Sequence, residues 1–374
     1  MTSPSENFFC QAPFTNIQST GDSNSPCCEI NFSVPASEDY FKDSHLAKIK
    51  EKLFNGISPS ECEKCIRTEK NSGQSLRKLI NDSFPERSKE ITNPDYFDIK
   101  DIFLVTSNTC NLKCLPCMGS SFIRDRELYE MGLSNKIPIA VKNNTDYKIF
   151  SSNKIETVTL SGGEPFYDKK TFKILEFLVE NNKSKNITLN INTNLTKIEE
   201  SLLIWLRDNF KHVIIKASID GVGSVNEYLR YPLTWEKVEE SIRKIQKFPD
   251  IGLLVTTALS NLSLMRYHEL IDWCLKKEIA DIFITPVDDT EELYYLNLPD
   301  DIKEYLTNKL SEKRDLNNIN DSYIRCINFA LDSIKNSNTF EPSKIKKFLD
   351  IHDAHRNTNY KNVFPEIAWI ENIK

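Results

Sequence analysis

The chain has 374 residues, of which 39% are hydrophobic and 27% charged, and its formal net charge is −6. This composition is typical of a folded protein with a sizeable core, and the length suits a catalytic domain with a smaller module. The negative net charge disfavours sequence-independent nucleic-acid binding, which needs a positive field, so we expect no nucleic-acid partner.

The N-terminal residues and the hydropathy of the chain predict neither export nor membrane insertion. The opening residues, MTSPSENFFCQAPF, contain no basic n-region and no apolar h-region of a secretory signal. No stretch approaches 18 consecutive apolar residues, so no membrane partner is expected. We therefore expect a soluble cytoplasmic protein. In that reducing compartment ten cysteines are too many to explain as disulfides, and clustered thiols indicate metal binding.

Residues 1–95 are rich in Ser, Asn and Pro and contain few periodic apolar runs. Helices are predicted over 45–54 and near 76–81, and the sequence TNPDY at 92–96 is typical of a linker. Because little apolar surface is available for a core, we expect this segment to need a bound metal or cluster to stay folded.

From residue 101 onward short apolar runs alternate with amphipathic ones. Strands are predicted over 101–107, 156–161, 186–193, 212–219, 251–259 and 281–287. The helices predicted between them cover 171–181, 198–209, 234–248 and 264–277. Beyond residue 299 the sequence is mostly helical, polar and rich in Asn and Lys.

This alternation predicts an α/β fold with a parallel sheet and right-handed crossovers. Six strands are fewer than in a complete eightfold barrel, so we expect a partial (β/α)6 TIM-like barrel with its chemistry on the loops after the strands. The expected organisation is a cysteine-rich module over 1–95, the barrel over 96–298 and a helical C-terminal extension over 299–374.

The first barrel strand is followed by TSNTCNLKCLPCMGS, which contains Cys110, Cys114 and Cys117. Three thiolates can hold three irons of a 4Fe–4S cubane and leave the fourth iron open to another ligand. The alternative is a zinc site. Zinc motifs favour two CxxC-like pairs or His partners, and no fourth ligand follows Cys117 closely.

This cysteine spacing resembles that of the radical S-adenosylmethionine superfamily, in which CNLKC is a frequent form. The resemblance implies that the amino and carboxylate groups of S-adenosylmethionine chelate the open iron. One electron then cleaves the cofactor to methionine and a 5′-deoxyadenosyl radical, which abstracts hydrogen from a substrate. Pro116 departs from the pattern, because the family often has an aromatic residue near adenine there.

The second barrel strand ends in SGGEP, which contains Gly162, Gly163 and Glu164. The glycines would let the backbone approach a ligand closely, and the carboxylate can accept from an ammonium group. The sequence resembles the family's GGEP motif, which holds the methionyl amine. Taken alone, it is also typical of an ordinary turn.

Later strand ends carry further candidate cofactor-binding residues. Asn194, in NINTNL, could face the cofactor or the substrate. The sequences KASIDG and EYLR resemble the family's Ser-x-Asp-Gly…Arg pattern, which implies that Ser218 and Arg230 lie near the cofactor's carboxylate and ribose. Asp220 is either part of this site or a turn former with Gly221.

Cys10, Cys27 or Cys28, Cys62 and Cys65 provide a set of four thiolates for a second cluster or for zinc. The pattern resembles the twitch module, the shortened relative of the SPASM domain, which implies an auxiliary 4Fe–4S cluster. Here the module precedes the barrel, whereas in better-known members it follows. The family's Pro-Cys pattern favours Cys27 over Cys28.

The remaining cysteines and histidines suggest no site. Cys274 and Cys326 are interpreted as buried structural thiols, and the pair His352 and His355 as a solvated surface.

The resemblance implies an enzyme that modifies a C–H position of a peptide, a protein side chain or a small molecule. Its implied partners are S-adenosylmethionine and a reductant such as flavodoxin or ferredoxin. The alternative is a non-catalytic iron–sulfur or zinc protein that serves as a scaffold or electron carrier.

Overall fold

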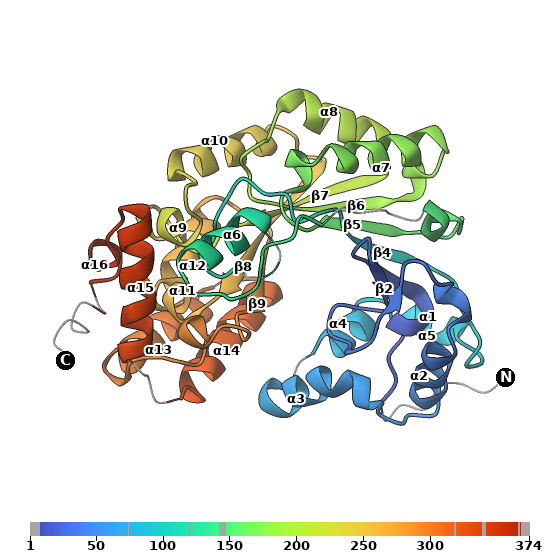
Figure 1. The fold of residues 1–374 in the computed structure, drawn as a ribbon, viewed down its shortest axis with the longest axis horizontal. Coiled ribbons are helices and arrows are strands. Elements are labelled where there is room, and N and C mark those ends of the chain that lie inside the picture. Colours follow the sequence, from blue (N-terminus) through green and yellow to red (C-terminus); the bar gives the residue numbers. More distant parts are fainter. Residues whose placement is uncertain are drawn as a thin grey trace. The chain divides into compact units, whose positions relative to one another are not determined.

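The computed structural model describes residues 8–73, 75–117, 119, 121–141, 147–317, 319–338, 342–365 and 367. The chain divides into two compact units, shown in Figure 1. The first comprises Met1–Ser107, Val141–Asn190 and Asn209–His212, and the second Asn108–Ala140, Ile191–Asp208 and Val213–Lys374.

The first unit contains a sheet with the strand order β3-β2-β1-β4-β5. Its strands are β1 (Asn16–Ser19), β2 (Ser23–Ser25), β3 (Val34–Pro35), β4 (Asp101–Val105) and β5 (Thr157–Ser161). The pairs β1–β4 and β4–β5 are parallel, whereas β1–β2 and β2–β3 are antiparallel. The short strands β1 to β3 were not predicted, because NIQS and SNS lack apolar alternation and are held by backbone pairing.

Helices of the first unit pack around a hydrophobic core that the sequence analysis did not anticipate. Phe14, Ile49, Leu53 and Ile91 are fully or almost fully buried in it, and Cys10 lies among them. The expectation that this segment has too little apolar surface for a core was wrong, because aromatic residues near the N-terminus pack onto α2. The helices are α1 (Ala12–Thr15), η1 (Tyr40–Lys42), α2 (Ser44–Phe54), η2 (Ser60–Cys62), α3 (Glu63–Ser72), α4 (Leu76–Ser83), α5 (Pro85–Glu90), η3 (Tyr147–Phe150), η4 (Pro165–Tyr167), α7 (Lys169–Glu180) and η5 (Ser184–Asn186).

The second unit contains the parallel strands β7 (His212–Ser218), β8 (Ile251–Leu259) and β9 (Asp281–Pro286). Strand β6 (Thr188–Thr193) is divided between the two units. All six predicted strands are therefore present as β4 to β9, and the α/β class with parallel strands is confirmed.

Helices of the second unit include the C-terminal helices that the sequence predicted. In order they are α6 (Phe122–Glu130), α8 (Glu200–Asn209), α9 (Ser224–Leu229), α10 (Trp235–Gln246), α11 (Asn261–Met265), α12 (Tyr267–Lys276), η6 (Glu291–Leu293), α13 (Asp300–Arg314), α14 (Asp321–Lys335), α15 (Pro342–Arg356) and α16 (Tyr360–Val363). The single helix predicted over 264–277 is two helices. The reason is a capping box between Ser260 and Ser263, which starts α11 separately, and a break in the helical backbone at Arg266.

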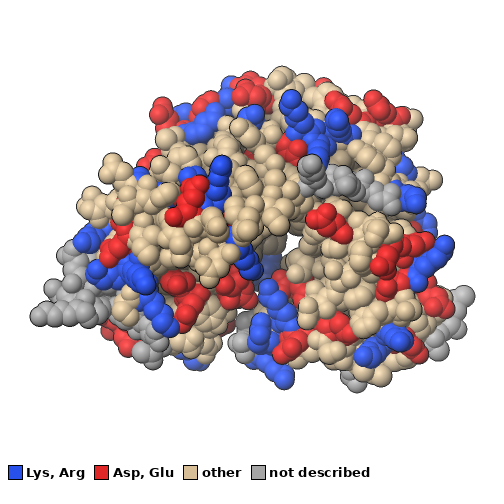
Figure 2. All heavy atoms as spheres, viewed as in Figure 1, with Lys and Arg blue, Asp and Glu red and all other residues tan. Residues whose placement is uncertain are grey.

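The charged surface is mixed in sign. Figure 2 shows Lys and Arg interspersed with Asp and Glu over the visible face. Among the described residues, no helix is both long enough and apolar enough to cross a bilayer.

Candidate active site

The loop that carries Cys110, Cys114 and Cys117 belongs to the second unit. Backbone hydrogen bonds hold it in place. The amides of Lys113 and Leu115 donate to the carbonyls of Tyr231 and Leu229, each at 2.7 Å. The amide of Cys117 donates to the carbonyl of Cys114 at 3.2 Å. All three thiols are half-buried in this anchored loop.

The three thiols are close enough to affect one another's ionisation. Burial raises the pKa of Cys114 to about 11, with Cys110 adding to the rise and Arg230 opposing it. Burial, then Cys114 and Cys110, raise the pKa of Cys117 further. Because three thiolates in one loop repel each other, holding them all ionised requires a positively charged group such as a metal cluster. The donor set therefore fits an iron–sulfur cluster.

Arg230 is directed at this loop by Asp220. One oxygen of the buried Asp220 accepts from Nη2 of Arg230 at 3.1 Å and from the amide of Ala258 at 2.8 Å. Its other oxygen lies 2.9 Å from Nε of Arg230. The remaining guanidinium nitrogen, Nη1, lies 4.0 Å from Sγ of Cys114. Asp220 therefore orients the arginine, and Arg230 places positive charge beside a candidate iron ligand.

Asn194 contacts a second thiol of the loop. Its side-chain amide donates to Sγ of Cys110 at 3.7 Å and to Asn111 at 2.9 Å. The backbone amide of Leu112 also donates to Cys110 Sγ, at 3.4 Å. Hydrogen bonds to ligand sulfurs stabilise the negative charge of an iron–sulfur site. Ser218, the last residue of β7, is partly exposed and lies opposite Thr256 of β8.

In the first unit, the turn after β5 uses its glycines to pack against the end of β4. Gly162 has a φ of 118°, and a Cβ there would lie 2.4 Å from the carbonyl oxygen of Ser107. The amide of Gly163 donates to that oxygen at 2.7 Å. Glu164 is buried, and its Oε1 accepts from the amide of Phe166 at 3.1 Å. The close approach at Gly162 is therefore to the chain's own backbone.

Gly162→Ala is expected to lower the free energy of unfolding by about 2–5 kcal/mol, because it combines an unfavourable φ with a steric clash. Gly132→Ala is the matched control. Gly132 also has a positive φ, of 69°, but nothing lies within 4 Å of its Cβ position, so about 1–2 kcal/mol is expected. Denaturant unfolding of both variants measures the difference, and equal losses would contradict the clash.

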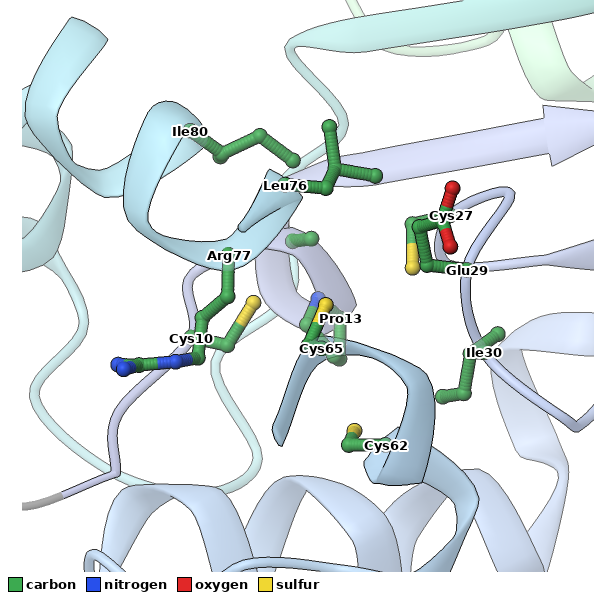
Figure 3. A pocket seen from close by; sticks show the side chains of 11 residues that line it. Cys10, Pro13, Cys27, Glu29, Ile30, Cys62, Cys65, Leu76, Arg77 and Ile80 are labelled. Atoms are coloured by element: carbon green, nitrogen blue, oxygen red, sulfur yellow. The ribbon is translucent and has the colours of Figure 1, made fainter. Parts of the chain in front are cut away.

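Four of the five N-terminal cysteines line one pocket of the first unit. Figure 3 shows the sulfurs of Cys10, Cys27, Cys62 and Cys65 directed into a common space. They come from four places: the segment before α1, the loop between β2 and β3, the end of η2 and the first turn of α3. Cys28 does not line this pocket and is exposed, with its sulfur 4.0 Å from Glu29 Oε1.

The wall of this pocket contains an arginine held in place by neighbours. Arg77 forms a bidentate ion pair with Glu69, at 2.9 and 2.6 Å, and donates to the carbonyl of Phe9 at 2.9 Å. Burial, and less so the other thiols, raise the pKa of Cys10 well above its ordinary value. Burial together with Cys65 raises that of Cys62 to about 12. As in the first loop, four ionised thiolates here require a cationic group.

Cys10, Cys27, Cys62 and Cys65 line one pocket of the first unit. Within the described parts of the chain, no three Cys, His, Asp or Glu side chains converge closely enough for one metal ion. A tetrahedral zinc ion would draw its sulfurs to about 2.3 Å from a single centre.

The structure also places a buried ionic network against the cysteine loop, which the sequence analysis missed. Arg124, Glu127 and His352 are completely buried and Arg356 is nearly so. The interpretation of His352 as a surface residue was wrong, because α15 turns that side chain toward Arg124, at 2.9 Å. The i, i+3 spacing of Arg124 and Glu127 and the i, i+4 spacing of His352 and Arg356 were the available signals.

Part of the chain matches the model of one protein family. Residues 104–274 match the family model described as the Radical SAM superfamily. A comparison with curated protein sequences finds no match.

Solved structures show partial similarity. A tagged anSMEcpe with bound AdoMet is 19% identical, with a TM-score of 0.43 over 58% of this chain, which spans 60% of the anSMEcpe chain. Streptococcus suis SuiB bound to S-adenosylmethionine is 14% identical, with a TM-score of 0.42 over 83% of this chain and 71% of SuiB. SuiB bound to the precursor peptide SuiA is 13% identical, with a TM-score of 0.38 over 84% of this chain and 71% of SuiB. These similarities are too weak to assign a substrate.

Proposed function

We propose that Cys110, Cys114 and Cys117 hold a 4Fe–4S cluster that binds S-adenosylmethionine, since residues 104–274 match the family model of the radical SAM superfamily. The observation that carries this proposal is that polar side chains contact the sulfur atoms of the cysteine loop. Asn194 donates to Cys110, and Arg230 approaches Cys114. When bound, the cluster and cofactor supply an electron and a 5′-deoxyadenosyl radical, which abstracts hydrogen from the substrate.

The chain's own residues bind and orient the cofactor in this proposal. Glu164 accepts from the cofactor's ammonium group, and the backbone of Gly162 and Gly163 shapes the same turn. Ser218 and Arg230 contact the carboxylate and ribose. Arginine suits this role because its guanidinium keeps its positive charge, and Asp220 orients it through Nε and Nη2.

Glu164→Gln is expected to weaken S-adenosylmethionine binding about ten- to a hundredfold, because the ammonium loses its charged acceptor. The amide oxygen of Gln can still accept from the Phe166 amide, so the unfolding temperature should stay near that of the wild type. Anaerobic calorimetry on the iron-loaded protein measures the affinity. An unchanged affinity would mean that Glu164 is not the acceptor for the cofactor's ammonium group.

We further propose that Cys10, Cys27, Cys62 and Cys65 hold an auxiliary 4Fe–4S cluster. The convergence of their sulfurs on one pocket supports this proposal, and the exposure of Cys28 supports Cys27 as the ligand. Four thiolates leave no iron open, so this cluster would accept an electron from a substrate radical without binding cofactor. In this scheme the module covers 1–95, the partial barrel 96–298 and the helical extension 299–374.

The substrate that we propose is a peptide or protein side chain, with a small molecule as the alternative and flavodoxin or ferredoxin as the reductant. The resemblance to enzymes with auxiliary clusters supports this class. The test is incubation of the iron-loaded protein with S-adenosylmethionine, dithionite and synthetic peptides encoded beside its gene. A mass change that requires both reagents supports a peptide substrate. Deoxyadenosine release without any modified peptide would favour a small molecule.

A further inference from the structure

Four buried side chains of α6 and α15 form one hydrogen-bonded network within the second unit. Glu127 accepts from Arg124 at 2.6 Å and from two nitrogens of Arg356 at 2.9 and 2.6 Å. His352 contacts Arg124 through Nε2, and its Nδ1 lies 2.7 Å from the carbonyl of Phe348. The network thus joins α15, drawn red in Figure 1, to α6.

Both arginines also donate hydrogen bonds to backbone carbonyls of the cysteine loop. Nη2 of Arg124 donates to the carbonyl of Leu115 at 3.2 Å, and Nη2 of Arg356 to that of Lys113 at 2.5 Å. The amides of the same two loop residues are already bound, as described above. Amide and carbonyl groups between the cysteines are therefore both fixed, which restricts where the three sulfurs can lie.

The buried network carries one net positive charge. Burial favours neutral Glu127, but hydrogen bonds and charges from Arg356 and Arg124 outweigh it and lower its pKa to about 2. Burial and then Arg124 lower the pKa of His352 to about 3, so it is neutral at pH 7. Burial lowers the pKa of Arg124 only to about 10, so it stays charged. Two arginines against one carboxylate leave an excess of one positive charge.

Among the described residues, Glu127 is the carboxylate that forms ion pairs with both Arg124 and Arg356. Lys113 and His355 lie 3.7 and 3.9 Å from Glu127, are about one-third exposed, and are themselves basic. Asp125 accepts from the amide of Gly119, and Asp353 from Tyr228, Thr358 and Tyr360, and neither carboxylate forms an ion pair with the network.

An uncompensated charge is costly to bury unless an anion lies nearby. The thiols of the loop are such partners in their ionised form. Arg124 donates to the carbonyl of Leu115, which lies between Cys114 and Cys117 in the chain, and Arg356 to that of Lys113, the residue before Cys114. A positively charged cluster core offsets part of the charge of the three thiolates, so core and thiolates together remain negative, and reduction makes them more so.

We propose that Arg124, Glu127 and Arg356 are positioning residues that hold the cysteine loop and, through their net positive charge, raise the reduction potential of the cluster bound there. The inference rests on the proposed function of Cys110, Cys114 and Cys117. It gives α15 a role in setting the reduction potential of the cluster, because part of the network comes from this helix.

The test compares two charge changes of opposite sign at the same network. Arg124→Gln removes the excess positive charge, and Glu127→Gln doubles it. The midpoint potential of the iron–sulfur signal that responds to S-adenosylmethionine is measured by EPR-monitored titration of the full-length protein. We expect a decrease for Arg124→Gln and an increase for Glu127→Gln. Each should change the reduction equilibrium about tenfold, which is about 59 mV for one electron.

Arg126→Gln is the matched control, because this residue of α6 has a 57% exposed side chain and pairs with Glu130 at the surface. Its potential should equal that of the wild type. Arg124→Lys keeps the charge and should have a near-wild-type potential. If Arg124→Gln does not fold, Arg124→Lys and Glu127→Gln still separate the effect of charge from that of substitution. Iron-loaded variants that leave the potential unchanged, or shift it in one direction only, would overturn the inference. A wild-type protein without a signal that responds to S-adenosylmethionine would instead overturn the proposed function.

Discussion

Cys114→Ala is expected to abolish cleavage of S-adenosylmethionine and to leave the metal of the N-terminal pocket in place. The reason is that the two sets of thiols have no ligand in common and lie in separate segments of the chain. With two iron ligands left, the loop cannot retain a cubane that needs three. Iron analysis after anaerobic reconstitution should fall from about eight to about four atoms per chain.

Cys274→Ala is the matched control for this variant. Cys274 is fully buried in α12 and belongs to neither set of thiols, so its loss should change neither the iron content nor the cleavage rate. If Cys114→Ala emptied both sites, the assignment of separate ligand sets would be wrong.

The double variant Cys62→Ala, Cys65→Ala should retain the iron of the cysteine loop and lose that of the N-terminal pocket. It should bind about four iron atoms and still release 5′-deoxyadenosine, yet form no modified substrate. The physical reason is that an auxiliary cluster with four thiolate ligands takes no part in cofactor cleavage but accepts an electron afterwards. Iron content, deoxyadenosine and product are measured on the same preparation.

Cys28→Ala provides a sharp control for the pocket, because Cys28 is the neighbour of Cys27 in sequence but lies outside the pocket and is exposed. It should keep about eight iron atoms, whereas Cys27→Ala should lose about four. Stoichiometric zinc in the natively purified protein, bound by the same four cysteines, would contradict electron transfer and leave the pocket a structural role.

The fold of the barrel segment was largely predictable because its strands are apolar and regularly spaced. β7, for example, alternates buried and partly exposed residues from Val213 to Ser218. By contrast, β1 to β3 are short, and they are specified by backbone pairing of β1 with β4, of β2 with β1 and of β3 with β2, which no local pattern reveals. The core around Phe14 and Ile49 was missed for a similar reason, since its members are far apart in the sequence.

The sequence was enough to predict which residue types form the candidate site. It was not enough to predict where their side chains lie and what they contact. Spacing identified Cys110, Cys114 and Cys117, yet it could not separate Cys27 from Cys28, which the fold places inside and outside the pocket. The sequence predicted a close backbone approach at Gly162 but not that the Ser107 carbonyl lies against it. His352 was missed as a buried residue because its burial depends on Arg124, more than two hundred residues earlier in the chain.

Reductive cleavage of the cofactor is the most direct test of the central claim, that this chain is a catalyst and not an iron–sulfur or zinc scaffold. The iron-loaded wild-type protein is incubated anaerobically with S-adenosylmethionine and dithionite, and 5′-deoxyadenosine and methionine are quantified by mass spectrometry. We predict that both are released in equal amounts, only with the reductant, and that Cys110→Ala releases neither. A wild-type protein with its full iron content that releases neither compound would contradict the account.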